Sequence, residues 1–276
     1  MKHLTPFFRV MSQRQDLALV LVLVLTIGML IMPLPAAFAD VLIGCNLSLS
    51  VLLLMVAVYL RSPLDLTALP GMILVSTVFR LALEVTVTRL ILTTADAGAI
   101  VETFGEFVIG GNIVVGLVVF AIVTTVQFIV VTKGTERVAE VGARFTLDAM
   151  PGKQMSIDSD LRSGDIDAIE ARRRRTELAS ESALHGAMDG ALKFVKGDAI
   201  AGLIIIVVNL VGGIGIGVAQ HGMAIGQAMQ TYTLLTVGDA LISQIPALLL
   251  SITAAVVVTR VGGHGMDLGR DMATQL

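Results

Sequence analysis

Six long apolar runs constrain the fold of this chain more than any other feature. Each run has about the 20 residues that a helix needs to cross the ~30 Å hydrocarbon core of a bilayer. Apolar residues make up 55% of the 276 residues and charged residues 15%, whereas soluble domains have roughly 45–50% and 25%. The sequence therefore predicts an all-α polytopic membrane protein with about six transmembrane helices. The runs are residues 17–38, 41–60, 68–92, 106–131, 199–219 and 233–259.

The basic residues predict the orientation of these helices. Of the 19 Lys and Arg residues, only Arg80 and Arg89 lie inside a run, and the others fall in the N-terminal arm, at Arg61, in the loop 132–198 or in the C-terminal tail. Loops 93–105 and 220–232 contain no basic residue. The positive-inside rule then places both termini and the loop 132–198 in the cytoplasm.

The first two runs are separated by Pro33-Leu34-Pro35 and Asp40. Because proline ends a helix, we expect these runs to form a tight hairpin. A second interpretation stays open at this point. Residues 1–40 also match a secretory signal peptide, since a basic N-terminal segment is followed by an apolar segment and by Ala37-Phe38-Ala39.

The loop 132–198 carries most of the charges, and we expect a small helical domain there. Val138, Val141 and Phe145 share one face of an amphipathic helix, which Pro151-Gly152 should end. A second helix should start near Asp165 or Asp167. The four arginines 172–175 resemble a lipid or nucleic-acid patch. However, the i,i+4 pairs Glu170–Arg174 and Arg173–Glu177 favour a salt-bridged, solvated face, so no nucleic-acid partner is expected.

These features divide the chain into four parts: residues 1–131 (arm and helices one to four), 132–198 (loop domain), 199–260 (helices five and six) and 261–276 (tail). Glycines punctuate the helices, and the GIGIG stretch lies in apolar sequence with no preceding strand. We therefore expect Gly213 and Gly217 to allow close helix packing rather than nucleotide binding.

Motifs for catalysis, metals and cofactors are not convincing. A calcium loop starting at Asp158 would have Ser163 where glycine is needed and Ile169 where glutamate is needed. Gly152-Lys153 lacks the remainder of a phosphate loop. The four histidines are far apart and show no metal-ligand spacing. The sequence thus predicts no enzyme, no metal site and no cofactor.

Ionisable residues inside the runs are the candidate functional residues, because charges in a bilayer are costly. Arg80 and Glu84 are one helical turn apart and should form an ion pair. Arg89 and Asp239 fall at similar depths and should form another. Asn209 and Asp198, with Lys193 nearby, would extend a polar path toward the cytoplasm. The alternative is that these groups only bridge helices, and that Asp198 is the N-cap of the fifth run.

Several stretches closely resemble the FHIPEP family, the large export-gate subunits of type III secretion systems. The resemblance covers essentially residues 15–262 and includes similar sequence around Arg80 and Arg89. The most specific stretches are TKGTERVAEV (132–141), RFTLDAMPGKQMSID (144–158), EARRRR (170–175), GAMDGALKFVKGDAIAG (186–202) and VGDALISQIPAL (237–248).

The resemblance implies a bacterial inner-membrane protein that forms a homo-nonameric ring around the export pore. It implies contact with other membrane subunits of the export apparatus and with exported, unfolded protein substrates. Family members use the proton motive force, and the matching positions tied to that coupling are Arg89, Lys193, Asp198, Asp239 and Asp189.

The sequence also departs from the family. Flagellar members usually have Asn where this chain has Glu84, and KGTERVAEV and QTYTLLTVGDA favour the virulence (injectisome) branch. The family has two further spans and a cytoplasmic substrate-docking domain beyond a point such as Leu276, so the resemblance implies that this chain is the transmembrane half. Three hypotheses stay open: a proton-coupled export gate, a structural ring that seats the pore, and an ordinary secondary transporter. No inverted repeat supports the last.

Overall fold

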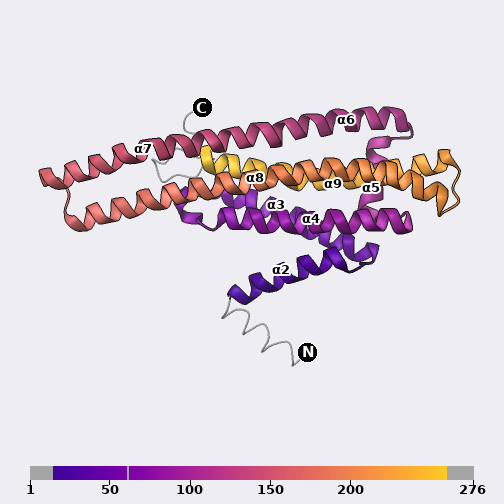
Figure 1. Ribbon diagram of the computed structural model, residues 1–276, viewed down its shortest axis with the longest axis horizontal. Coiled ribbons are helices and arrows are strands. Elements are labelled where there is room, and N and C mark those ends of the chain that lie inside the picture. Colours follow the sequence, from indigo (N-terminus) through magenta and orange to yellow (C-terminus); the bar gives the residue numbers. More distant parts are fainter. Residues whose placement is uncertain (1–14, 61, 260–276) are drawn as a thin grey trace, which may run out of the picture. The chain divides into compact units, whose positions relative to one another are not determined.

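The computed structural model describes residues 15–60 and 62–259, and every regular element in these ranges is helical (Figure 1). The predicted all-α architecture is therefore confirmed. The N-terminal arm, Arg61 and the tail, on which parts of the orientation and the signal-peptide alternative depend, lie outside the described residues. The elements are α2 (Gln15–Ile31), α3 (Ala36–Tyr59), η1 (Pro63–Leu66), α4 (Leu69–Thr94), α5 (Ala99–Ile109), α6 (Ile113–Ile129), η2 (Val130–Thr135), α7 (Glu136–Ser163), α8 (Ala168–Ala219) and α9 (Ile225–Thr259).

Within residues 15–60 and 62–259, five helices, rather than the predicted six, are long and apolar enough to cross a membrane. They are α3, α4, the continuous helix Ile113–Ser163 that contains α6, η2 and α7, α8, and α9. The first predicted run corresponds to a shorter apolar helix, Leu19–Ile31. It ends early because Pro33 and Pro35 follow, and α3 begins directly after them at Ala36.

The fourth predicted run, 106–131, is wrong at its start because two glycines divide it. Gly110 and Gly111 have φ angles of 50° and 84°, which end α5 in a left-handed conformation. Asn112 then caps α6, since its side-chain oxygen accepts from the backbone N–H groups of Val114 and Val115 at 3.1 and 3.2 Å. The long apolar helix thus begins at Ile113.

Two further expectations about helix ends are corrected. Pro151 does not end a helix but lies inside α7, which runs on to Ser163. No helix begins near residue 199, because α8 is one helix of 52 residues from Ala168 to Ala219 and contains the fifth run in its second half. The start of α8 agrees with the prediction, since Asp167 accepts a hydrogen bond from the N–H of Glu170 at 2.7 Å.

The described residues form two compact units. Unit 1 consists of those in Met1–Asn46, Val78–Leu117 and Ile204–Ile242, and unit 2 of those in Leu47–Thr77, Val118–Leu203 and Ser243–Leu276. The core of unit 1 is apolar and brings together α2, α3, α4, α5 and α9. Its buried members include Met29, Ile43, Val87, Ile91, Val101, Tyr232 and Leu235.

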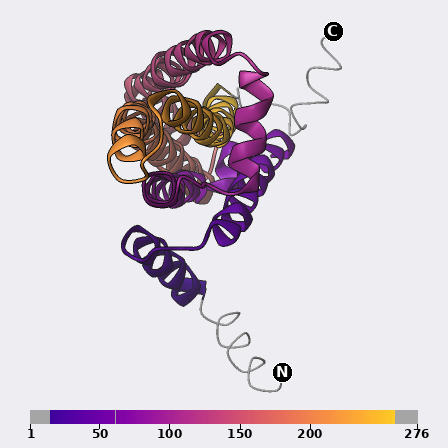
Figure 2. The ribbon, with the colours of Figure 1, turned by 90° about the vertical axis from the view of Figure 1, so that its right-hand side faces the viewer.

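In unit 1, α5 lies across the longer helices, which Figure 2 shows nearly end-on. Glycines make this crossing possible. A Cβ atom on Gly105 would lie 2.4 Å from the carbonyl oxygen of Leu234, and one on Gly238 would lie 2.0 Å from that of Val101. The start of α5 is held by Asp40 of α3, whose carboxylate accepts from the N–H groups of Ala99 and Ile100 at 3.0 and 3.2 Å.

The predicted role of Gly213 and Gly217 is confirmed, and their partner is an aromatic ring of α9. A Cβ atom would lie 2.3 Å from Tyr232 Cδ1 at position 213 and 2.5 Å from Tyr232 Cε2 at position 217. Only residues without a side chain leave room for the Tyr232 ring against α8.

In unit 2, α7 and the first half of α8 pair through apolar contacts and ion pairs. Buried Ile157, Ala171 and Leu178 pack together. The predicted Glu170–Arg174 and Arg173–Glu177 pairs form, at 2.9 and 2.5 Å. Further pairs, Lys153–Glu181, Arg174–Asp160 and Arg175–Asp158, join the two helices. We call Glu136–Ser163 and residues 168–198 together the α7/α8 hairpin.

The residues of α7 that pack within the chain differ from the apolar face expected from the sequence. The buried residues near its start are Ala139 and Ala143. Val138, Val141 and Phe145, which the sequence placed on one apolar face, are exposed in the single chain. Small residues fill the close contact, and a Cβ on Gly142 would lie 2.8 Å from Val258 Cγ1 of α9.

Candidate functional site

A cluster of polar residues lies inside the apolar core of unit 1, where α4, α8 and α9 contribute to it. Residues four apart share one face of a helix, and α4 presents Arg80, Glu84 and Thr88 in this way. Arg80 Nε lies 4.0 Å from Glu84 Oε1, and both side chains are buried. A buried cation and a buried anion at this distance attract each other strongly, because little water screens their charges.

Asn209 joins this face of α4 to α9. Its amide nitrogen donates to Thr88 Oγ1 at 3.3 Å and to Asp239 Oδ2 at 3.5 Å. Asn209 is fully buried and Asp239 is 7% exposed. Glu84 and Asp239 are near enough to interact electrostatically. The structure thus brings together two carboxylates, one guanidinium and one amide in the helix core of unit 1.

Arg89 does not form the expected pair with Asp239. Its guanidinium donates to the carbonyl oxygens of Leu30 and Ile31, at 2.6 and 3.0 Å. These carbonyls end α2, where a helix leaves acceptors without intrahelical partners and favours a positive charge. Arg89 does not need Asp239 as a partner, because the two carbonyl oxygens at the end of α2 already accept from the N–H donors of its guanidinium.

Asp198 belongs to unit 2 and lies in the interior of α8, with 3% of its surface exposed. It cannot be the N-cap of a helix, because α8 starts 30 residues earlier at Ala168. The capping interpretation is therefore wrong. A buried carboxylate in the middle of a helix needs another explanation, which keeps Asp198 among the functional candidates.

The lysines near Asp198 have partners of their own. Lys193 donates to Asp189 at 2.7 Å, and this hydrogen bond raises the pKa of Lys193. Lys196 lies 2.7 Å from Glu136 at the start of α7. The sequence pointed to Lys193 and Asp189 but not to Glu136. The i,i+4 spacing of Asp189 and Lys193 was a usable signal, whereas a pair 60 residues apart leaves none.

Buried Tyr232 and Thr236 and half-buried Thr88 are further polar residues that sequence reasoning did not select. Thr88 continues the four-residue spacing of Arg80 and Glu84, which could have identified it. Tyr232 and Thr236 precede Asp239 by about two turns and one turn.

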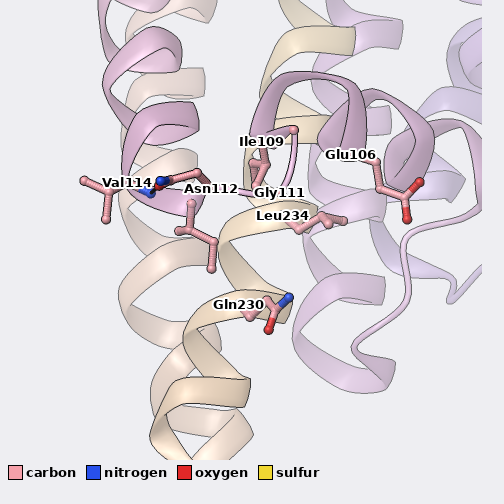
Figure 3. A pocket seen from close by; sticks show the side chains of 9 residues that line it. Glu106, Ile109, Gly111, Asn112, Val114, Gln230 and Leu234 are labelled. Atoms are coloured by element: carbon pink, nitrogen blue, oxygen red, sulfur yellow. Dashed lines mark hydrogen bonds between the residues drawn. The ribbon is translucent and has the colours of Figure 1, made fainter.

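A cavity of about 620 Å³ lies at the turn between α5 and α6 (Figure 3). Glu106, Asn112, Gln230 and Leu234 line it, together with the Gly110-Gly111 turn. None of the predicted functional residues lines this cavity. Among the described residues, no group of three or more His, Cys, Asp or Glu side chains could hold a metal ion.

Comparison with known families gives a match to the FHIPEP family model over residues 26–276. The chain belongs to the FHIPEP family. The resemblance seen in the sequence, to the export-gate proteins of type III secretion, is thereby confirmed.

Curated relatives agree with this assignment. The probable translocation protein y4yR of Sinorhizobium fredii is 64% identical over 245 residues, which are 88% of this chain and 35% of that protein. Low calcium response locus protein D of Yersinia pestis is 57% identical over 96% of the chain and 38% of its own length. Protein MxiA of Shigella flexneri is 54% identical over 98% and 39%. This FHIPEP chain thus spans little more than a third of these relatives. No solved structure gives a significant match.

Proposed function

We propose that this FHIPEP protein is an export-gate component of a type III secretion system and couples the proton motive force to the movement of unfolded protein substrates. The observation that carries the coupling is the contact between Asn209 and Asp239 inside an apolar helix core, at 3.5 Å. Placing a charged carboxylate inside an apolar core costs free energy, so such a residue is expected to have a partner or a function. Asn209 can donate to the ionised form, and its amide cannot take the proton away.

The protein works as a multi-pass component of the bacterial inner membrane, with both ends of this chain and the α7/α8 hairpin in the cytoplasm. The distribution of Lys and Arg supports this orientation. It assembles as a homo-oligomeric ring, nonameric as in the family resemblance, with other membrane subunits of the export apparatus. The exposed apolar side chains Val138, Val141 and Phe145 on α7 support contact with another copy. The similarity to these relatives favours the injectisome branch.

Within this function, Asp239 and Asp198 are the residues that take up and release protons, and Asn209 positions Asp239. Lys193 and Asp189 lie on the outside of α8 at the level of the hairpin, where an exposed ion pair suits contact with water or a partner. Arg89 supports the path indirectly, since it holds the end of α2 against α4.

The test is export by the full-length protein with single substitutions. Asp239→Asn and Asp198→Asn should insert and assemble normally but lose export, because the amide keeps the size of the side chain and cannot titrate. Asp198→Glu should keep part of the activity. Glu102→Gln changes an exposed acid of α5 and serves as the matched control. Full export by both Asn variants would refute the proton-handling role.

A second candidate function is a purely structural ring that seats the pore. The observation in its favour is Arg89, whose donors are used to hold the two carbonyls at the end of α2. This candidate predicts the opposite pattern at position 198. The Asn variant should be tolerated, and the larger Glu should disturb the packing of unit 2.

A further inference from the structure

In unit 1, α8 and α9 meet along a seam whose residues are four apart on α8 and four and then three apart on α9. The α8 side presents Gly217, Gly213 and Asn209 in order from the connecting loop inward. The α9 side presents Tyr232, Thr236 and Asp239. Two contacts fix the register: Tyr232 lies against both glycines, and Asp239 accepts from Asn209. Residues four apart lie on one helix face, so Thr236 faces the seam between these contacts.

The Tyr232 ring fills the end of the seam nearest the loop between α8 and α9. Tyr232 is fully buried. Cβ atoms at positions 213 and 217 would come within 2.3 and 2.5 Å of the ring, and one at 217 also within 3.1 Å of Ala228 Cβ. The ring therefore occupies all the space that the two glycines leave. Tyr232 is seven residues nearer the loop than Asp239, a distance of about 10 Å along the helix.

The seam contains polar atoms that need partners. Among the described residues, the hydroxyl of Tyr232, Thr236 Oγ1 and Asn209 Oδ1 make no hydrogen bond. All three residues are at most 2% exposed. A buried hydroxyl or amide oxygen without a partner destabilises the folded protein. Proteins commonly satisfy such groups with buried water that makes two to four hydrogen bonds.

We propose that this seam is a water-binding site that connects Asp239 with the loop side of unit 1, and that the Tyr232 ring closes it. Ordered water bridges Thr236 and Asn209, and it reaches the carboxylate of Asp239. The ring in the Gly213/Gly217 notch separates this water from the solvent around residues 220–224. The proposal rests on the proposed function for its biological meaning, since it regulates access to Asp239. Its physical content is the hydration and closure of the seam.

The experiment measures thiol accessibility in the assembled full-length protein. Cys45, the single native cysteine, is replaced by serine, and Thr236→Cys is introduced. A small, charged, membrane-impermeant methanethiosulfonate is then applied from the side of the loop 220–224. With Tyr232 present, Cys at 236 should react slowly. With Tyr232→Ala, its reaction rate should rise by at least about tenfold. Tyr232→Phe should keep the site closed, because the ring remains.

Two further variants make the result decisive. Leu235→Cys, whose position is buried in the apolar core, should stay unreactive in every background. If Leu235→Cys becomes reactive together with Thr236→Cys, the helices have only loosened and the seam is refuted. Gly217→Ala forces the ring out by a second route and should open the seam if Tyr232→Ala does not assemble.

Fast reaction at position 236 with Tyr232 in place would overturn the closure, and no reaction after removal of the ring would overturn the hydration. Neither measurement depends on export. A seam that opens as expected, together with full export by Asp239→Asn, would keep this inference and reject the proposed function. A seam that stays unreactive after removal of the ring, together with loss of export by Asp239→Asn, would reject this inference and keep the proposed function.

Discussion

Charged residues in unit 1 and in the α7/α8 hairpin show two ways of placing charges in one chain. In unit 1, Arg80 and Glu84 pair at 4.0 Å with side chains that are 3% and 7% exposed. In the hairpin, the pairs around Arg173 are shorter, yet their side chains are 32–56% exposed. The same residue types therefore act in nearly dry and in wet surroundings.

The difference teaches that distance alone does not tell how much a pair matters. In the hairpin, water replaces any lost partner, and neighbouring charges are redundant. Glu170, for example, accepts from both Arg173 and Arg174, and these hydrogen bonds hold its pKa at about 2. In unit 1, a charge that loses its partner stays in an apolar core, which is much more costly.

The strongest test of this comparison is Arg80→Met. Removal of one partner from a buried pair should destabilise the protein by about 3–5 kcal/mol, because Glu84 keeps its charge in the core. Thermal unfolding of the detergent-solubilised protein would measure the change. Arg175→Met, at an exposed pair of the hairpin, is the control and should have little effect. Equal losses for the two variants would contradict the comparison.

Arg89→Ala should have the next largest effect. It removes charged donors from the carbonyls of Leu30 and Ile31, and hydrogen bonds to charged groups contribute about 1.5–3 kcal/mol. The loss should be local, so limited proteolysis should cut near the end of α2 while α8 and α9 stay protected. Arg89→Lys should recover only part of the stability, because lysine lacks the forked geometry. An unchanged cleavage pattern would show that Arg89 does not hold α2.

Lys153→Met should change stability by less than about 1 kcal/mol, since the Lys153–Glu181 pair is at the surface. A double-mutant cycle with Glu181→Gln, measured by urea unfolding, would give the coupling energy directly. A coupling as large as that expected for Arg80 would mean that the hairpin is less accessible to water in the assembly than in one chain.

The smallest expected effect is the pH response of His185 in the hairpin. Burial lowers the pKa of His185, Lys153 acts in the same direction and Glu181 opposes them. The folded hairpin thus binds this proton less tightly than the unfolded chain. Stability should fall as the pH drops below about 6.5, the unperturbed value, and should be fully present above it. Amide exchange of α7, corrected for its intrinsic pH dependence, should rise several-fold between pH 7 and pH 5.5. His185→Gln should remove this response.

Local features of the sequence predicted the helices and their charge pairs well. The prolines at 33 and 35 end α2, and the pairs Glu170–Arg174 and Arg173–Glu177 follow from i,i+4 spacing. Pro151 was misjudged because contacts that hold α7 come from α8, 14 or more residues away in sequence. The N-cap hypothesis for Asp198 failed for a similar reason, since hydropathy changes at residue 199 while the helix does not.

The candidate site was only partly predictable. Asp239 and Asn209 could be selected because polar residues in apolar runs are rare, and the structure brings them together. The partners of Arg89 and Lys196 could not be selected. One pair involves backbone carbonyls, which every residue has, and the other joins Lys196 to Glu136, 60 positions apart. The division of the chain at residues 132 and 198 stays a prediction.

The crossing of α5 and α9 at Gly105 and Gly238 has a consequence for the genetics of this protein. Every missense change of a glycine codon adds a Cβ atom, and at these two positions that atom would meet a backbone carbonyl oxygen at 2.4 or 2.0 Å. Random mutagenesis should therefore recover null alleles at both codons whatever amino acid is introduced, unlike at Gly215, where no atom lies within 4 Å. Because no second-site side-chain change can remove a carbonyl oxygen, revertants of these alleles should mostly restore glycine itself.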